Sequence, residues 1–351
     1  MTVSHKISLF DAPAIERLRR QLRLDPQQVR VLRNKMLKRF LADEVAMQDF
    51  SGREHVDCHT LTLFRRCDSE IDGASKLLFR TTAGMLIESV ILRIATGRTT
   101  LCVSSQVGCA AACDFCATGK MGIAQNLSAA EILDQVLQAG QILKTEDRRL
   151  QNVVFMGMGE PFHNEENLNE VVESLTASHL FDRSPGSILV STVGVADAML
   201  RFAKRFPLVN LALSLHSVDQ ETREGIIPLA KKFPLQQLRA TLLEINQIQQ
   251  RETMIEYLML AGVNDSLDDA HQLAVWLQGI DAHVNLIPYN AIEDSPHLSG
   301  TARDDITAFA DVLKAAGQKT TVRYSLGSDI AAACGQLVRK ENRQHAIDSH
   351  L

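Results

Sequence analysis

The strongest pattern in the chain is an alternation of two kinds of segment that differ in the spacing of their apolar residues. From about residue 99 to residue 326, short apolar runs alternate with longer stretches in which apolar residues recur every three to four positions. The short runs are typical of buried strands, and the longer stretches have the period of amphipathic helices. Because the runs are apolar on both faces, we expect a parallel sheet covered by helices. The expected strands are LCVSS, NVVFMGM, SILVST, LVNLALS, TMIEYLML, HVNLIPY and KTTVRYS.

The number of these units predicts an open barrel. About six strand–helix units follow one another, which is fewer than the eight of a closed TIM barrel. The sequence therefore predicts an α/β fold with a partial (βα)6 barrel of the TIM type, and a doubly wound sheet stays open as the alternative. In both folds, ligands bind at the carboxyl ends of the strands. The small, polar turns expected at those ends are 157–161, 191–194, 214–216 and 288–290.

The first hundred residues follow different patterns. Residues 12–45 carry apolar positions at helical intervals with a break at Pro26, so we expect two helices. Residues 61–95 alternate apolar and polar side chains around two glycine turns, as in a small antiparallel meander. We therefore predict a small N-terminal helical and antiparallel β appendage on the barrel. The expected domains are a helical region 1–60, a β extension 61–98, a barrel core 99–337 and a flexible polar tail 338–351.

Composition places the chain among ordinary globular proteins. Its 351 residues can bury a large core. The sequence has no run of about 18 apolar residues, and its first residues lack the apolar segment of a signal peptide. Four of the seven cysteines are crowded between residues 102 and 116, which favours a reducing compartment where thiols serve metals or catalysis. We therefore expect a cytoplasmic protein without a membrane partner.

Charge is distributed unevenly along the chain. The net charge is -5, yet nine Arg or Lys residues lie between Glu16 and Phe40 beside only two acidic residues. Such a run is either a solvated helix face or a surface that contacts phosphates. The sequence alone leaves both interpretations open.

Three cysteines carry the clearest chemical signal. Cys109, Cys113 and Cys116 form a C-x3-C-x2-C triplet in a loop after the first expected barrel strand. A structural zinc site needs four protein ligands, and no paired CxxC or HxxxH ligands lie nearby. A 4Fe-4S cluster held by three cysteines keeps one iron open for a small molecule. The triplet therefore predicts an iron–sulfur cluster, with zinc completed by a distant His, or ordinary buried cysteines, as the alternatives.

With this triplet at the end of the first barrel strand, the chain resembles the radical S-adenosylmethionine (SAM) superfamily. The resemblance implies that the open iron binds the amino and carboxylate groups of SAM. It also implies that an electron from the reduced cluster splits SAM to a 5′-deoxyadenosyl radical, with a flavodoxin or ferredoxin as the electron donor. The turn GMGE at 157–160 is similar to the superfamily element that meets the SAM amino group.

Further segments resemble the RlmN/Cfr family of ribosomal RNA adenine methyltransferases, in order from about residue 72 to residue 337. The family implies methylation of an adenine ring carbon in large-subunit ribosomal RNA, with transfer RNA as a further substrate, and we expect a monomer. GEP and NLIPYN favour carbon 2, whereas CATGK and SPGSILVSTVGV resemble Cfr, which implies carbon 8 and antibiotic resistance. The segments are CVSSQVGCAAACDFCATGK, NVVFMGMGEP, VSTVGV, LALSLH, IEYLMLAGVND, VNLIPYN and DIAAACGQL.

The resemblance also implies roles for single residues. An adenine ring carbon is not nucleophilic, whereas a thiolate readily accepts a methyl group from SAM. Cys334 matches the family's methyl-carrying cysteine, Cys102 the cysteine that releases the RNA adduct and ends as its disulfide partner, and Glu88 the proton acceptor. From the residues alone, both cysteines would be apolar core and Glu88 would face water. The positions that match SAM-binding residues are Gly159, Glu160, Ser191, Ser214, Leu215, His216 and Asn290.

Some features depart from the family pattern or match no part of it. The N-terminal region lacks the Arg-, Gln- and Trp-rich helix of typical RlmN proteins, and the only Trp is Trp276, so the expected RNA contact of residues 1–60 is divergent. Cys58 and Cys67 match no family role, and we expect them to be buried structural cysteines. If Cys334 works with Cys102, the C-terminal loop must fold back over the carboxyl ends of the strands.

Two functions of other classes remain as alternatives. One is a different radical SAM reaction, such as methylthiotransfer or glycyl-radical activation, for which Cys334 would be dispensable. The other is a non-catalytic iron–sulfur protein that senses redox state or iron while binding RNA. Cleavage of SAM to 5′-deoxyadenosine by the reduced protein would exclude the second.

Overall fold

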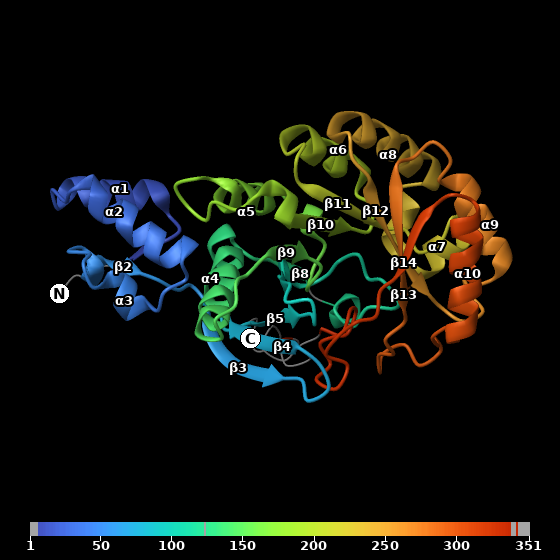
Figure 1. Cartoon of the computed structure of the whole chain (residues 1–351), viewed down its shortest axis with the longest axis horizontal. Helices are drawn as coiled ribbons and strands as arrows, with labels where there is room; N and C mark the ends of the chain where they lie inside the picture. The colour runs from blue at the N-terminus through green and yellow to red at the C-terminus, as the bar shows by residue number, and fades with distance from the viewer. Residues whose placement is uncertain (1–5, 123, 338–341, 343–351) are drawn as a thin grey trace.

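One ten-stranded mixed sheet runs through the core and the β extension (Figure 1). The computed structural model describes residues 6–122, 124–337 and 342, so the expected tail 338–351 lies outside the described residues apart from Asn342. In spatial order the strands are β14 (Lys319–Val322), β13 (Ala282–Pro288), β12 (Thr253–Met259), β11 (Asn210–Ser214), β10 (Ile188–Thr192), β9 (Asn152–Phe155), β6 (Thr99–Cys102), β5 (Leu86–Arg93), β4 (Ala74–Arg80) and β3 (Thr62–Asp68).

Seven strands of this sheet, β6 and β9 to β14, are parallel and lie side by side in sequence order. A doubly wound sheet would reverse that order at a switch point, and no reversal occurs among the described strands. β14 and β3 are the two edges of the sheet, so the described strands do not close into a barrel. This topology is consistent with the predicted partial barrel and removes the doubly wound alternative, and the α/β prediction is confirmed.

Helices cover the outer face of the parallel strands, as Figure 1 shows. Their apolar sides are buried against the sheet, which is why the sequence has the period of amphipathic helices there. Among the described residues, no helix is both long and apolar enough to span a membrane. The helices are α4 (Ala129–Thr145), α5 (Glu165–Thr176), α6 (Ala196–Arg205), the short α7 (Gln220–Ile226), α8 (Leu235–Gln249), α9 (Leu267–Trp276) and α10 (Arg303–Ala315).

The β extension continues the same sheet with antiparallel pairing. β3, β4 and β5 form the expected meander, and β5 pairs antiparallel with the first barrel strand, β6. β4 and β5 are buried almost throughout, whereas the edge strand β3 is exposed along nearly its whole length. The Ser89 hydroxyl on β5 donates to Gln135 of α4 at 2.6 Å, so α4 covers one face of this part of the sheet.

The N-terminal region is mainly helical. It contains β1 (Ile7–Ser8), α1 (Ala12–Gln21), α2 (Pro26–Arg33), α3 (Asp43–Met47) and β2 (Val56–Asp57). Pro26 stands in the first turn of α2, where its missing N–H costs nothing, and the Asp25 carboxylate accepts from the Gln27 N–H at 2.8 Å. The expected break at Pro26 is therefore present.

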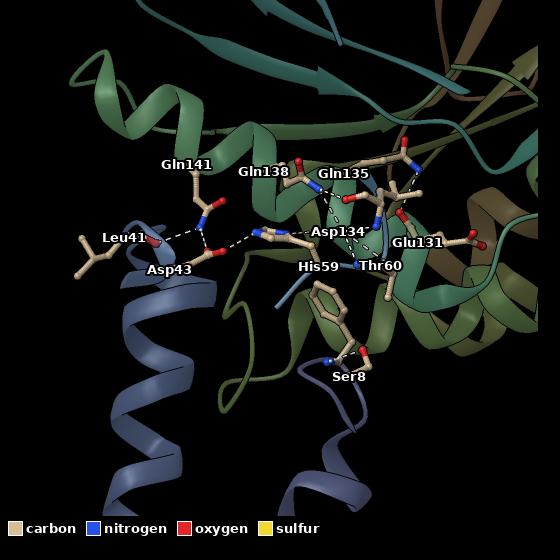
Figure 2. Close-up of polar contacts among 12 residues, drawn as sticks. Ser8, Leu41, Asp43, His59, Thr60, Glu131, Asp134, Gln135, Gln138 and Gln141 are labelled. Atoms are coloured by element: carbon tan, nitrogen blue, oxygen red, sulfur yellow. Dashed lines mark hydrogen bonds and ion pairs between the residues drawn. The ribbon is translucent and has the colours of Figure 1, made fainter. Parts of the chain in front are cut away.

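A polar cluster joins the N-terminal region to α4 of the core (Figure 2). His59 Nε2 bonds Asp43 of α3 at 2.9 Å, and His59 Nδ1 bonds Asp134 of α4 at 2.7 Å. Gln141, two turns further along α4, donates to Asp43 at 2.8 Å. The expected domain boundaries stay a prediction, but this cluster identifies residues that fix the N-terminal helices against the core.

Candidate cluster and cofactor site

The three-cysteine loop is the connection of a small hairpin. β7 (Gln106–Gly108) and β8 (Ala124–Asn126) pair antiparallel and close the base of the loop. Cys113 is buried, Cys109 and Cys116 are partly buried, and all three are free thiols. Gly119 packs against the loop so closely that an added Cβ would lie 2.9 Å from the Cys113 nitrogen. The loop is therefore held in one compact form that brings the three thiols close enough to interact electrostatically.

The surroundings of these thiols fit an iron–sulfur cluster. Burial raises the pKa of Cys109 to about 12 and that of Cys113 well above its usual value, so the thiolates need positive charge nearby. The backbone N–H groups of Ala111 and Ala112 bond the Cys109 sulfur, a feature that tunes cluster potentials. No three His, Cys, Asp or Glu side chains in the described ranges surround a single metal position. Three thiols that each bind a different iron of one cluster need no such common centre.

Arg223 of α7 lies beneath this loop and was missed by the sequence reasoning. Its side chain is 0% exposed; Nε donates to the Leu215 carbonyl at 3.0 Å and one terminal nitrogen to the Val193 carbonyl at 2.6 Å. The other terminal nitrogen, Nη1, has no hydrogen-bond partner within the described part of the chain. Burial lowers the pKa of Arg223 to about 10, and its charge acts on Cys113. A buried cation without a carboxylate is costly unless an anion joins it, and a thiolate-bound cluster would be that anion.

The turns after β9 and β10 meet beside the loop. Gly159 has φ +104°, and an added Cβ would lie 2.6 Å from the Gln106 side chain, so only glycine fits. The buried Glu160 carboxylate accepts from the Val193 N–H at 2.9 Å and the Phe162 N–H at 3.0 Å. Burial still raises the pKa of Glu160 to about 7. This carboxylate is thus poised to receive a cationic group such as an amine.

The turn after β11 contributes a neutral imidazole. His216 has φ +59°, and its Nδ1 accepts from the Leu258 N–H at 3.0 Å. Burial, and secondarily the charge of Arg223, lowers the pKa of His216 to about 3, so Nε2 carries the only ring proton. The imidazole ring packs edge-on against the ring of Phe115 in the cysteine loop, with 4.8 Å between the two ring centres. The remaining expected positions lie on the same rim: Leu215 is buried, and Ser191 Oγ lies 3.5 Å from Ser214 Oγ.

The C-terminal segment 327–337 folds back across the carboxyl ends of the strands, as expected from the sequence. It contacts the β extension, the cysteine loop and the turn after β13. The bonds are Gly327 N–H to Asp72 at 2.7 Å, Lys76 Nζ to the Ala331 carbonyl at 3.1 Å, Ala117 N–H to the Gly335 carbonyl at 2.8 Å, Asn290 Nδ2 to the Cys334 carbonyl at 3.1 Å and Gln336 Nε2 to the Ala291 carbonyl at 3.2 Å.

This fold brings Cys334 and Cys102 together, although 232 positions separate them in the sequence. The two thiols are close enough to interact electrostatically, and both are free. Cys334 is exposed on one side, but the protein around its other sides desolvates the thiol and raises its pKa to about 11. Burial raises the pKa of Cys102 to about 12. Arg323, which follows β14, counteracts both shifts. Sequence reasoning missed Arg323 because nothing local links it to either cysteine.

Glu88 corrects the expectation drawn from strand alternation. Its side chain is 1% exposed instead of facing water, because the C-terminal segment covers the sheet face on which it lies. Lys76 on β4 lies 3.3 Å from its carboxylate and also donates to the Ala331 carbonyl. The expectation for Cys58 and Cys67 was also wrong, because both are only partly buried.

Known proteins resemble the chain over most of its length. The Radical SAM superfamily matches residues 103–274. A probable RNA methyltransferase of Rhodopirellula baltica is 65% identical over 98% of this chain and 90% of its own length. A probable dual-specificity RNA methyltransferase RlmN of Thermus thermophilus is 42% identical over 78% of this chain and 76% of its own length.

A solved structure agrees with these sequence relatives. A radical SAM methyltransferase from Sphaerobacter thermophilus has a TM-score of 0.89 and 35% identity, covering 94% of this chain and 99% of that one. The chain belongs to the RlmN/Cfr family of radical SAM methyltransferases.

Proposed function

We propose that this protein methylates a ring carbon of adenine, with carbon 2 favoured, in large-subunit ribosomal RNA and also in transfer RNA. The observation that carries the proposal is that Cys334 lies within electrostatic reach of Cys102 and that its segment bonds the three-cysteine loop, Ala117 N–H to the Gly335 carbonyl. Relatives named dual-specificity RNA methyltransferases support RNA as the substrate. The enzyme would work as a monomer in the cytoplasm, with a flavodoxin or ferredoxin as electron donor.

The family implies a 4Fe-4S cluster and SAM, which would supply one-electron chemistry and the methyl group. Cys109, Cys113 and Cys116 would hold the cluster, and Arg223 would balance its negative charge. The carboxylate of Glu160 would receive the SAM amino group, since its own partners are uncharged donors: the Val193 and Phe162 N–H groups and the Thr192 hydroxyl. Gly159, Ser191, Ser214, Leu215, His216 and Asn290 would line the rest of the SAM site.

The chain's own residues would then carry the methyl group. The Cys334 thiolate, stabilised by Arg323, would accept a methyl group from SAM and later carry the methyl-derived carbon onto the adenine ring. Glu88 would accept the proton that leaves the ring, and Lys76 would hold its carboxylate in place. Cys102 would release the RNA by forming a disulfide with Cys334, which must be reduced before another turnover.

The N-terminal region offers a surface for the RNA backbone. Arg17, Arg23, Arg30 and Arg39 are exposed, and within the described residues their side chains have no hydrogen-bond or ion-pair partner. Four other members of the basic run, Arg19, Arg20, Lys35 and Lys38, are paired with acids, as Lys38 is with Asp182 at 2.9 Å. The four arginines therefore support a phosphate-contacting role of residues 1–60. An adenine that is methylated must leave its stack, so a separate anchoring surface would help to hold the RNA.

Mass spectrometry of the purified, active protein tests the cysteine roles. We expect the Cys334 peptide to carry an added methyl group and Cys102→Ala to accumulate RNA covalently attached to Cys334. Cys67→Ala is the matched control and should behave like wild type, because this partly exposed thiol has no role in the reaction. An unmodified Cys334 in active enzyme would contradict the mechanism.

The position of the new methyl group is a separate measurement. Chromatography and mass spectrometry of nucleosides from RNA methylated by the enzyme distinguish 2-methyladenosine from 8-methyladenosine. We expect 2-methyladenosine. Detection of 8-methyladenosine alone would assign the Cfr-like reaction without changing the roles of Cys334 and Cys102.

A further inference from the structure

The exposed edge of the β extension carries an aromatic ring close to two arginines. Phe64 on β3 is 48% exposed, and the guanidinium carbons of Arg80 and Arg65 lie 4.8 Å and 5.8 Å from the ring centre. Both arginines are exposed, and in the described ranges neither contacts a carboxylate. The register of β3 and β4 shifts between Leu63 and Arg65, so Phe64 stands at the irregularity of an edge strand. We call Phe64, Arg65 and Arg80 the edge platform.

We propose that the edge platform binds a single-stranded segment of the RNA substrate, with one base stacked on Phe64 and phosphates at Arg65 and Arg80. Aromatic rings bordered by basic side chains bind single strands in this way, because every base has a π face and every phosphate a negative charge. The inference rests on the proposed function in one respect, namely that RNA is the substrate.

Strand register places the edge platform on the same sheet face as the candidate catalytic residues. Arg80 and Lys76 are separated by four positions on β4 and therefore point to one face, where Lys76 meets Glu88. On β5, Val90 shares the face of Glu88 and is the register partner of Cys102 on β6. From β3 to β6 are three strand spacings, about 14 Å. The edge platform thus lies about three strand spacings from the strand that carries Cys102.

The opposite face of the same strand provides a contrast. Arg66, the neighbour of Arg65, donates to Asp68 at 2.8 Å and to Glu146 at the end of α4 at 3.0 Å. Its charge is satisfied within the protein, whereas the charges of Arg65 and Arg80 are balanced by no acid in the described residues. Only the platform side of β3 is therefore electrostatically complementary to a polyanion.

Binding of a 20-nucleotide single-stranded RNA that contains the methylated adenine, titrated at several salt concentrations, tests the proposal. Phe64→Ala should weaken binding about tenfold. Arg80→Gln should weaken binding and lower the slope of log affinity against log salt by about one. Arg66→Gln is the matched control on the other face and should bind like wild type. Circular dichroism would verify that each variant is folded.

A fluorescence experiment keeps the proposal testable if Phe64→Ala is unstable. Phe64→Trp in a Trp276→Phe background leaves one indole in the chain. Stacking of a base should quench its emission when the single strand binds, and a duplex of the same sequence should quench it much less. Unchanged emission, or wild-type affinity of Phe64→Ala, would overturn the edge platform. Methylation by wild type is measured in parallel: if wild type methylates no RNA, the proposed function fails, whereas platform variants with normal affinity refute only the platform.

Discussion

Two buried or partly buried cations, His59 and Arg223, lie in opposite kinds of surroundings. His59 joins the N-terminal region to the core and is bonded on both ring nitrogens by carboxylates, from Asp43 and Asp134 (Figure 2). Although burial opposes the charge, these bonds raise the pKa of His59 to about 10. Arg223 lies under the cysteine loop, bonds only carbonyl groups and has a pKa that burial lowers to about 10.

The two sites differ in whether the chain itself supplies the counter-charge: it does for His59 and does not for Arg223. The chain itself neutralises His59, and Asp134 also accepts from the backbone N–H groups of Thr60 and Leu61 at 2.7 and 2.8 Å. Nothing in the described residues neutralises Arg223 while the cysteines are protonated thiols. A charge of this kind is expected to be costly alone and favourable once an anion is bound. The first site thus serves structure, and the second anticipates the cluster.

The largest expected effect comes from Arg223→Met in the cluster-loaded protein. Loss of the buried charge should cost about 3 to 5 kcal/mol of stability there. Without the cluster, the stability of the variant should differ from wild type by no more than about 1 kcal/mol. The variant loses the hydrogen bonds to the two carbonyl groups, but it is also relieved of the cost of burying the charge. The measurement is anaerobic thermal unfolding with and without the cluster.

Redox titration followed by electron paramagnetic resonance measures the reduction potential of the cluster, which would not change if Arg223 were only structural. Arg223→Met should shift the cluster potential to more negative values, since positive charge nearby favours the reduced state. Arg223→Lys keeps the charge and should shift the potential less. Equal destabilisation of loaded and cluster-free protein, with an unchanged potential, would show that Arg223 only packs.

Asp134→Asn tests the completed site and should cost about 2 kcal/mol. In the variant, the amide oxygen can still accept from the Thr60 and Leu61 N–H groups. The amide nitrogen then faces the protonated His59 Nδ1, and because both groups are donors no hydrogen bond can form between them. Urea unfolding measures the loss. Glu131→Gln on the same helix is the control, because its carboxylate only caps α4 at the surface. A variant as stable as wild type would mean that the Asp134 charge contributes nothing to the joint.

The sequence predicted those features whose causes are local. Buried parallel strands require apolar runs on both faces, and the carboxyl-end turns follow directly from them, so the core and the rim that includes Glu160 and His216 were predictable. Glu88 was not, because the segment that covers it lies more than 240 positions later. Arg223 on α7 and Arg323 after β14 were not predicted for the same reason: an arginine at either place is ordinary in sequence, and only the fold shows which thiols it meets.

A pH dependence that belongs to His59 tests the same joint. Because its pKa rises from 6.5 to about 10 on folding, its contribution to stability is complete below about pH 6.5 and is lost as pH rises through about 10. One proton gives a slope of at most about 1.4 kcal/mol per pH unit. The pKa of Glu160 is raised from 4.5 to about 7, so this residue lowers the stability of the fold as pH rises between those two values. Above about pH 7 its contribution stays constant and adds no slope.

Urea unfolding of wild type and His59→Gln between pH 7 and pH 10 isolates this contribution. Cys102, Cys109 and Cys334 titrate at about 11 to 12 in the folded protein and so bind their protons throughout this range, equally in both proteins. The difference in unfolding free energy between the two proteins should therefore shrink steadily as pH rises, because only wild type has the imidazolium to lose. A difference that stays constant would mean that His59 holds the joint as a neutral ring, and the contrast with Arg223 would then be one of packing and not of charge.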